Sequence, residues 1–308
     1  MAQTGEWAIW LSPWVLGALG LCIGSFLNVV AHRLPRMMER QWWRDVAQQL
    51  SDSESFQRTF GRGAPKPLAA TSGELEQELD KLGRLTLSKP ASRCPACQHR
   101  IRWHENIPLV SWLRLRGRCS ACGTRISVRY PLLELATGLL FAGIAWRVGP
   151  QPVALAWCGV AATLVALTAI DWDTTLLPDA LTLPLLWAGL CAAALEWTLP
   201  LSTSLWGAVV GYLSLWSVYW LFKLTTGKEG MGHGDFKLLA ALGAWLGWKA
   251  ILPIVLMASV IGAVVGIGMK LSDTLREGRY VPFGPFLAGG GLVLMLAGTE
   301  TVLGWIGQ

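Results

Sequence analysis

Two acidic residues lie where the chain leaves or enters an apolar segment. Asp171 ends one such segment, and Asp235 stands in Gly-Met-Gly-His-Gly-Asp-Phe-Lys (230–237), directly before another. A carboxylate at a membrane entrance is costly to desolvate, so it needs a partner or a function. Two further apolar segments separate the acids, which returns the chain to the same membrane face. Two neighbouring carboxylates can share a proton, one acting as a base on water and the other as an acid on a carbonyl. The pattern therefore predicts an aspartic protease with Asp171 and Asp235 as its catalytic pair.

Other interpretations of the acids remain open. They could merely cap helices, and Asp179 beside Pro178 favours a helix start. Asp173 is two residues from Asp171, so it is expected to be solvated or to lie behind the pair. The series Asp171-x-Asp173-x-Thr175 is also similar to the aspartyl nucleophile of a phosphatase. That chemistry requires a strand followed by a loop, whereas here a long apolar run precedes the acids.

The glycine-rich stretch before Asp235 is the candidate substrate-binding segment, with Gly230, Gly232, Gly234 and Lys237 as its residues. A phosphate loop is disfavoured because no strand precedes the glycines and the Lys/Ser pair is missing. The glycines are expected instead to let a peptide backbone approach closely. Lys237 is expected either to orient a carboxylate or to reach for the membrane interface.

Four cysteines have a spacing close to that of a zinc ribbon, Cys94-x2-Cys97-x21-Cys119-x2-Cys122, in which each pair supplies two ligands of a tetrahedron. In a reducing cytoplasm such thiols favour metal over a disulfide, and a polar segment gains folding free energy from the ion. Because four thiolates leave no open coordination position, the expected zinc is structural. Unligated or redox thiols are the alternative, and His99 and His104 are spare ligands.

Membrane helices must position these residues, because the 308-residue chain is 53% hydrophobic and only 15% charged. That composition is too apolar for an ordinary soluble domain. The sequence predicts an all-α polytopic membrane protein with about eight transmembrane helices. The expected segments lie at about 10–31, 131–148, 152–170, 178–197, 204–223, 236–248, 250–270 and 283–306.

One polar insert interrupts these segments. Residues 33–130 contain 18 Lys and Arg and 9 Asp and Glu, a net charge of +9, whereas the rest of the chain carries −3. We therefore divide the chain into a first transmembrane helix (1–32), an insert (33–130) with the four-cysteine site at 94–122, and a transmembrane core of about seven helices (131–308). The fold of residues 37–90 is not predicted.

Basic residues predict the orientation, since they favour cytoplasmic loops. Periplasmic N- and C-termini would place 24 of the 26 Lys and Arg in the cytoplasm. The zinc-ribbon-like insert and both acids would then be cytoplasmic. The first ten residues contain no Lys or Arg, so the first apolar segment is expected to be an uncleaved span rather than a secretory signal.

Motifs along nearly the whole chain occur together in one order. They are Gly24 to Val30 with His32 to Pro35, the paired CxxC knuckles, Asn106-Ile107-Pro108, Leu115 to Cys119, Arg129-Tyr130-Pro131 with Glu134, Leu176 to Asp179, Gly230 to Lys237, and Pro282 to Pro285. In these motifs the sequence resembles the bacterial type IV prepilin peptidases, also called leader peptidase/N-methyltransferases, which are membrane aspartic proteases.

The resemblance implies an enzyme of the bacterial inner membrane that cuts the basic leader of type IV prepilins and pseudopilins after a glycine, at the cytoplasmic face. It implies that the enzyme then methylates the new N-terminal amine with S-adenosylmethionine. The family's motifs place the catalytic pair on Asp171 and Asp235. No glycine-rich nucleotide fingerprint marks the methyl-donor site, for which Gly117 and Glu134 are candidates. The expected partners are the prepilins and pseudopilins of type IV pilus and type II secretion systems, together with membrane lipid. Nucleic acid is not an expected partner.

Two other classes of protein also fit parts of the sequence. A transporter would place acids among membrane helices, but usually near the middle of the membrane and in broken helices. A non-catalytic assembly subunit of a secretion or pilus system would explain the insert and the spans, but it would not need two acids on one face.

Overall fold

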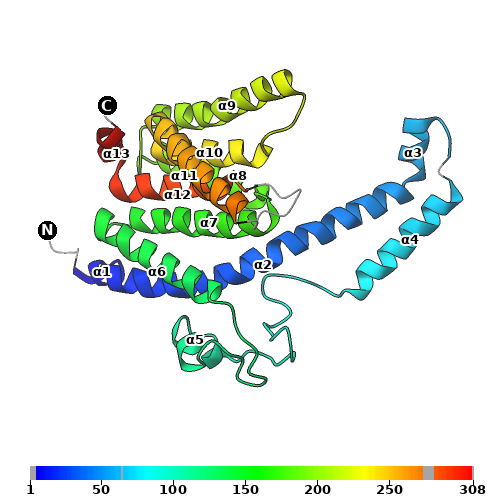
Figure 1. Ribbon diagram of the computed structural model, residues 1–308, viewed down its shortest axis with the longest axis horizontal. Coiled ribbons are helices and arrows are strands. Elements are labelled where there is room, and N and C mark those ends of the chain that lie inside the picture. Colours follow the sequence, from blue (N-terminus) through cyan, green and yellow to red (C-terminus); the bar gives the residue numbers. More distant parts are fainter. Residues whose placement is uncertain (1–4, 64, 273–280, 307–308) are drawn as a thin grey trace.

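The computed structural model describes residues 5–63, 65–272 and 281–306, and they form a bundle of helices with a long hairpin projecting from it (Figure 1). Within these residues no strand occurs beyond two isolated bridges. The all-α class expected from the sequence is confirmed. The helices are α1 (Gly5–Trp10), α2 (Pro13–Ser51), α3 (Ser53–Phe60), α4 (Lys66–Lys81), η1 (Trp103–Glu105), α5 (Val110–Arg114), α6 (Arg129–Val148), α7 (Val153–Thr174), α8 (Asp179–Ala194), α9 (Leu201–Thr226), α10 (His233–Leu246), η2 (Trp248–Ala250), α11 (Ile251–Leu271), α12 (Gly284–Ala297) and α13 (Thr299–Ile306).

Five of the described helices are long and apolar enough to cross a membrane, namely α2, α6, α7, α9, and α11 together with η2. The pair α12 and α13, bent by 106°, makes a sixth if it is one broken span. The polytopic class is therefore confirmed. The other two of the eight expected segments form α8, which has 16 residues, and α10, which has 14. At about 1.5 Å per residue they measure roughly 24 and 21 Å, short of a hydrocarbon core of about 30 Å.

Helix α10 can be short because other helices surround it. Its side chains from Leu238 to Trp245 are all buried, and it packs against α8, α9 and α12. A helix that is apolar on every side is stable only where neighbours cover every side. The surroundings of α10 therefore fix the position of Asp235 at its start.

Small residues let α9 approach α10 closely. Gly207 of α9 faces Gly243 of α10, and a Cβ on either would collide with the backbone carbonyl of the other. The Ser204 hydroxyl donates a hydrogen bond to the carbonyl of Ala244 at 2.6 Å. Inside a membrane the hydrophobic effect does not drive helices together. Close backbone packing and hydrogen bonds between helices are the usual means of association there. These contacts fix the position of α10 along the axis of α9.

The polar insert begins as a helical extension of the first span. Helix α2 runs for 39 residues without a break and contains Pro35, and α4 returns beside it as the second arm of the projecting hairpin (Figure 1). The buried Ser72 hydroxyl donates to the carbonyl of Ala47 at 2.8 Å, which joins the two arms. The domain division at residues 32 and 130 stays a prediction, and no loop separates its first two parts.

A buried arginine ties the segment after α4 to α2. The guanidinium of Arg33 donates to the carbonyls of Thr86 at 2.9 Å and Pro90 at 2.7 Å. Each backbone carbonyl that accepts from a charged donor is held more strongly than in a neutral hydrogen bond. The segment leading to the first cysteine pair is thus fixed against the first span.

Candidate active site

Asp171 lies in the last turn of α7. The helix ends because Thr175 adopts a left-handed conformation (φ 54°), and its N–H donates to the carbonyl of Asp171 at 2.8 Å. The Asp171 side chain is only 4% exposed. The apolar run of α7 therefore carries this acid to its end and leaves it buried.

Asp235 lies in the first turn of α10, which begins after Gly232. A negative charge is favourable there, because unpaired backbone N–H groups make the start of a helix positive. The Asp235 side chain is 7% exposed. The second acid is thus also buried, at the start of a helix rather than at its end.

The structure brings the two acids together. They lie close enough for their like charges to oppose one another, and Oδ2 of Asp171 and Oδ1 of Asp235 are both buried without a hydrogen-bond partner. Leu177 packs close to the residues beside each acid. A Cβ on Gly234 would lie 2.7 Å from Leu177, and a Cβ on Gly284 would lie 2.6 Å from Oδ2 of Asp171 and 3.1 Å from Leu177. Two buried carboxylates with free oxygen atoms form a site that can hold a proton and a water molecule.

The glycine-rich stretch has close neighbours within the same chain. A Cβ on Gly230 would meet the ring of Phe222 at 2.8 Å, and one on Gly234 would meet Leu177. A Cβ on Gly232 would meet only Oδ2 of Asp235, at 3.8 Å. Intramolecular packing therefore explains two of the glycines, and Gly232 has the most open surroundings. Contact of the three with a substrate stays a prediction.

Lys237 pairs with an acid of α8. Its Nζ lies 2.7 Å from both carboxylate oxygens of Asp179. Of the two roles expected for Lys237, this geometry matches orientation of a carboxylate. Asp179 is the first residue of α8, as its position after Pro178 predicts, but Pro178 occupies the N-cap position and no side chain caps this helix. The pair joins α8 to α10 beside Asp235.

Arg129 was not among the expected site residues, yet it contacts the end of α7 on both sides of Asp171. Its Nη1 lies 2.6 Å from Oδ1 of Asp173, and its Nη2 donates to the carbonyl of Ala169 at 3.0 Å. The Asp173 side chain is 41% exposed, which matches the solvated alternative. Arg129 belongs to a motif quoted above, but the sequence gives no signal for its partners.

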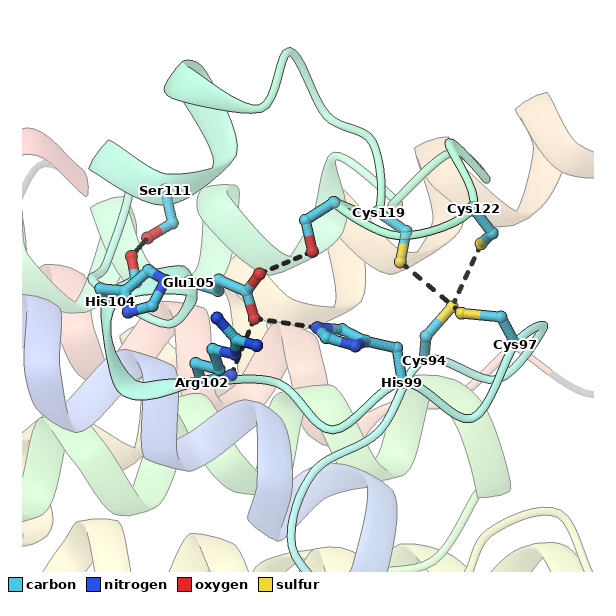
Figure 2. A network of polar contacts seen from close by, with 10 residues as sticks. Cys94, Cys97, His99, Arg102, His104, Glu105, Ser111, Cys119 and Cys122 are labelled. Atoms are coloured by element: carbon cyan, nitrogen blue, oxygen red, sulfur yellow. Dashed lines mark hydrogen bonds and ion pairs between the residues drawn. The ribbon is translucent and has the colours of Figure 1, made fainter.

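The four cysteines converge as their spacing predicts (Figure 2). Their sulfur atoms all lie within 4.8 Å of one another. The Cys94–Cys122 and Cys97–Cys119 sulfur distances are 3.8 and 3.9 Å. Four thiolates at about 2.3 Å from a zinc ion would be roughly 3.8 Å apart. The residues present therefore fit a tetrahedral metal ion, and neither nearby histidine belongs to the cluster.

Glu105 contacts the knuckles from η1. Its Oε2 accepts from the backbone N–H of Arg102 at 2.8 Å and lies 3.2 Å from Nε2 of His99, while its Oε1 accepts from the hydroxyl of Ser120 at 2.6 Å. The Arg102 N–H and the Ser120 hydroxyl hold the pKa of Glu105 at about 2, well below its usual range. Figure 2 shows this carboxylate between the two knuckles. Nothing in the spacing of the cysteines predicts it.

Glu134 and Gly117 both have contacts with α5 or the residue before it. Buried Glu134 of α6 accepts from the N–H of Leu109 at 2.8 Å. Gly117 has φ +67°, and a Cβ there would lie 2.8 Å from the ring of Trp112. Both candidates thus have structural contacts, and their part in methyl-donor binding stays a prediction.

Fold and site together define a class, a helical membrane protein with two buried, neighbouring carboxylates and, in a polar insert, a four-cysteine cluster that fits a metal ion. Comparisons with known proteins agree. Residues 18–148 match the family described as Bacterial Peptidase A24 N-terminal domain, and residues 158–267 match the Type IV leader peptidase family. No solved structure matches the chain.

Curated relatives are similar along almost the whole chain, and each is named prepilin leader peptidase/N-methyltransferase. The protein of Stutzerimonas stutzeri is 49% identical over 288 residues, covering 94% of this chain and 91% of its own. That of Pseudomonas putida is 49% identical over 282 residues, covering 92% and 89%. That of Aeromonas salmonicida is 47% identical over 297 residues, covering 95% and 94%. The chain therefore belongs to the type IV leader peptidase family.

Proposed function

We propose that this protein cuts the basic leader from type IV prepilins and pseudopilins and then N-methylates the new N-terminal residue. The observation that carries the proposal is the meeting of two buried carboxylates, each with an unpartnered oxygen, at the ends of α7 and α10. The names of its relatives indicate the substrate class. Asp171 and Asp235 are the proposed catalytic residues.

The two carboxylates can hydrolyse a peptide bond without a covalent intermediate. They share one proton, because two like charges so close together are unfavourable. The ionised carboxylate takes a proton from water while the water oxygen attacks the scissile carbonyl carbon, and the protonated carboxyl gives its proton to the carbonyl oxygen. When the tetrahedral intermediate collapses, the C–N bond breaks and the leaving amine takes the proton removed from water. The hydroxyl that re-forms the carbonyl returns its proton to the carboxylate that first donated it. The pair is then ready for the next cycle.

Helix positions explain why cleavage would occur at a membrane surface. Asp171 ends the membrane-spanning α7, and Asp235 begins α10. A prepilin could therefore leave its hydrophobic helix in the lipid and present its leader at this surface. We place the pair and the insert on the cytoplasmic side of the inner membrane, with both termini periplasmic, because that orientation keeps most basic residues in the cytoplasm.

Two further groups belong to the proposed enzyme. Cys94, Cys97, Cys119 and Cys122 would hold a structural Zn²⁺, which stabilises the fold of the insert when bound. S-adenosylmethionine supplies the methyl group when bound. Glu134 can accept hydrogen bonds from the amine or hydroxyl groups of such a donor, and Gly117 is the second candidate residue for this site.

One incubation tests both activities. The purified protein is mixed with a prepilin and isotopically labelled S-adenosylmethionine, and the products are weighed by mass spectrometry. We expect loss of the leader and label on the new N-terminus only. Uncut prepilin would contradict the peptidase, and a cut but unlabelled product would contradict the methyltransferase.

The metal is tested separately. Cys94→Ser removes one of four thiolates, so zinc per protein molecule should fall well below that of the unaltered protein. An unchanged zinc content would rule out this ligand set.

A further inference from the structure

We propose that Glu105 is a positioning residue that joins the two cysteine knuckles and so preassembles the metal site. Its carboxylate bonds to both knuckles at once, through Oε2 to His99 and through Oε1 to Ser120 (Figure 2). The cysteine spacing predicts the ligand set. The two contacts of Glu105, with His99 and with Ser120, are seen only in the three-dimensional structure, and we call them the clamp.

Each partner of Glu105 is an integral part of one knuckle. His99 closes the first, because its carbonyl accepts from the N–H of Cys94 at 2.9 Å. Ser120 directly follows Cys119 in the second, whose turn is closed by the N–H of Cys119 donating to the carbonyl of Thr124 at 2.9 Å. Movement of one knuckle away from the other must therefore break a bond to Glu105.

The Glu105 and His99 side of these contacts is partly shielded from water, whereas Ser120 is exposed. The Glu105 side chain is 11% exposed and that of His99 is 27% exposed. Hydrogen bonds to an ionised carboxylate are about twice as strong as neutral ones, and limited exposure reduces competition from water. The carboxylate thus holds the knuckles more firmly than a surface ion pair would.

Glu105 itself is anchored to the membrane helices. The η1 turn that carries it is fixed by Ser111 of α5, whose hydroxyl donates to the carbonyl of His104 at 2.9 Å. The start of α5 is held in turn by Glu134 of α6, through the N–H of Leu109. A chain of hydrogen bonds therefore leads from a membrane span to the metal site.

This arrangement predicts an effect on metal retention. Four thiolates repel one another before the ion arrives, so a scaffold that keeps them close lowers the cost of binding. Loss of a residue that hydrogen-bonds around metal ligands and orients them typically lowers metal affinity by about 10- to 100-fold. Loss of the clamp should therefore speed zinc release by about tenfold or more.

The test uses the full-length protein in detergent, with zinc release to a chromogenic chelator as the readout. Glu105→Gln keeps the size of the side chain but removes its charge, and Ser120→Ala removes only the bond to the second knuckle. We expect release about tenfold faster for Glu105→Gln and a smaller increase for Ser120→Ala. Glu76→Gln on the exposed face of α4 is the matched control and should release zinc at the unaltered rate.

A double variant makes the test sharper. If the Glu105–Ser120 bond is the link, Glu105→Gln with Ser120→Ala should release zinc no faster than Glu105→Gln alone. Release at the unaltered rate from both single variants would overturn the proposal. Should Glu105→Gln fail to fold, an unchanged rate for Ser120→Ala alone would also overturn it. Peptidase activity plays no part in the readout, so the result is independent of the proposed function.

Discussion

Gly284→Ala should displace a proposed catalytic carboxylate while leaving the bundle folded. A Cβ at Gly284 would lie 2.6 Å from Oδ2 of Asp171, whereas ordinary contacts begin at 3.4 Å. The oxygen must therefore move by about 0.8 Å. It is the end of a rotatable side chain, so the carboxylate can yield at little cost in stability. A misplacement of about 1 Å can reduce a rate by roughly 100-fold, so we expect kcat for leader cleavage to fall about 100-fold with a smaller change in KM.

The assay is steady-state cleavage of a purified prepilin, with thermal unfolding measured on the same samples. Gly289→Ala is the matched control, because it lies in the same helix and a Cβ there meets nothing within 4 Å. It should cleave at the unaltered rate. Refutation would be a Gly284→Ala enzyme with kcat within about threefold of the unaltered value, since Oδ2 of Asp171 would then not need its present position.

Two further predictions concern packing and positioning. Gly207→Ala should lower the free energy of unfolding by about 1 to 3 kcal/mol, as measured by thermal unfolding. The new Cβ overlaps the carbonyl of Gly243, and overpacking costs about that much. Gly159→Ala should show no such loss, because a Cβ there meets open space. Arg129→Met should lower kcat about tenfold with zinc content unchanged, because it removes two hydrogen bonds that bracket Asp171 and each bond to a charged group is worth about 1.5 to 3 kcal/mol. An unchanged kcat would show that the end of α7 holds its position without Arg129.

Local patterns predicted the parts of the site that depend on spacing. The four cysteines converge because two short turns each present two thiols, and such turns form from neighbouring residues. An even number of apolar segments between Asp171 and Asp235 predicts that both acids lie at the same end of the bundle. Neither result required knowledge of how the helices pack.

Tertiary packing decided what the sequence could not indicate. The apolar segment that starts after Asp235 forms a 14-residue helix that is buried against α8, α9 and α12, and its hydropathy alone does not indicate these neighbours. Gly284 approaches Asp171 from 113 positions away, and Arg129 bonds to α7 residues 44 and 40 positions away. No local pattern indicates such contacts. The clamp at Glu105 was missed for the same reason, since its two partners belong to different turns.

The most direct test of the central claim is single-turnover cleavage by Asp171→Asn, Asp235→Asn and the double variant, with prepilin binding measured on each. The account predicts that either single change abolishes cleavage while binding persists. The double change should be no worse, because the two residues act as one unit. Asp80→Asn, on the exposed face of α4, should cleave normally. Cleavage by either active-site variant at more than about a tenth of the unaltered rate would contradict a shared-proton pair.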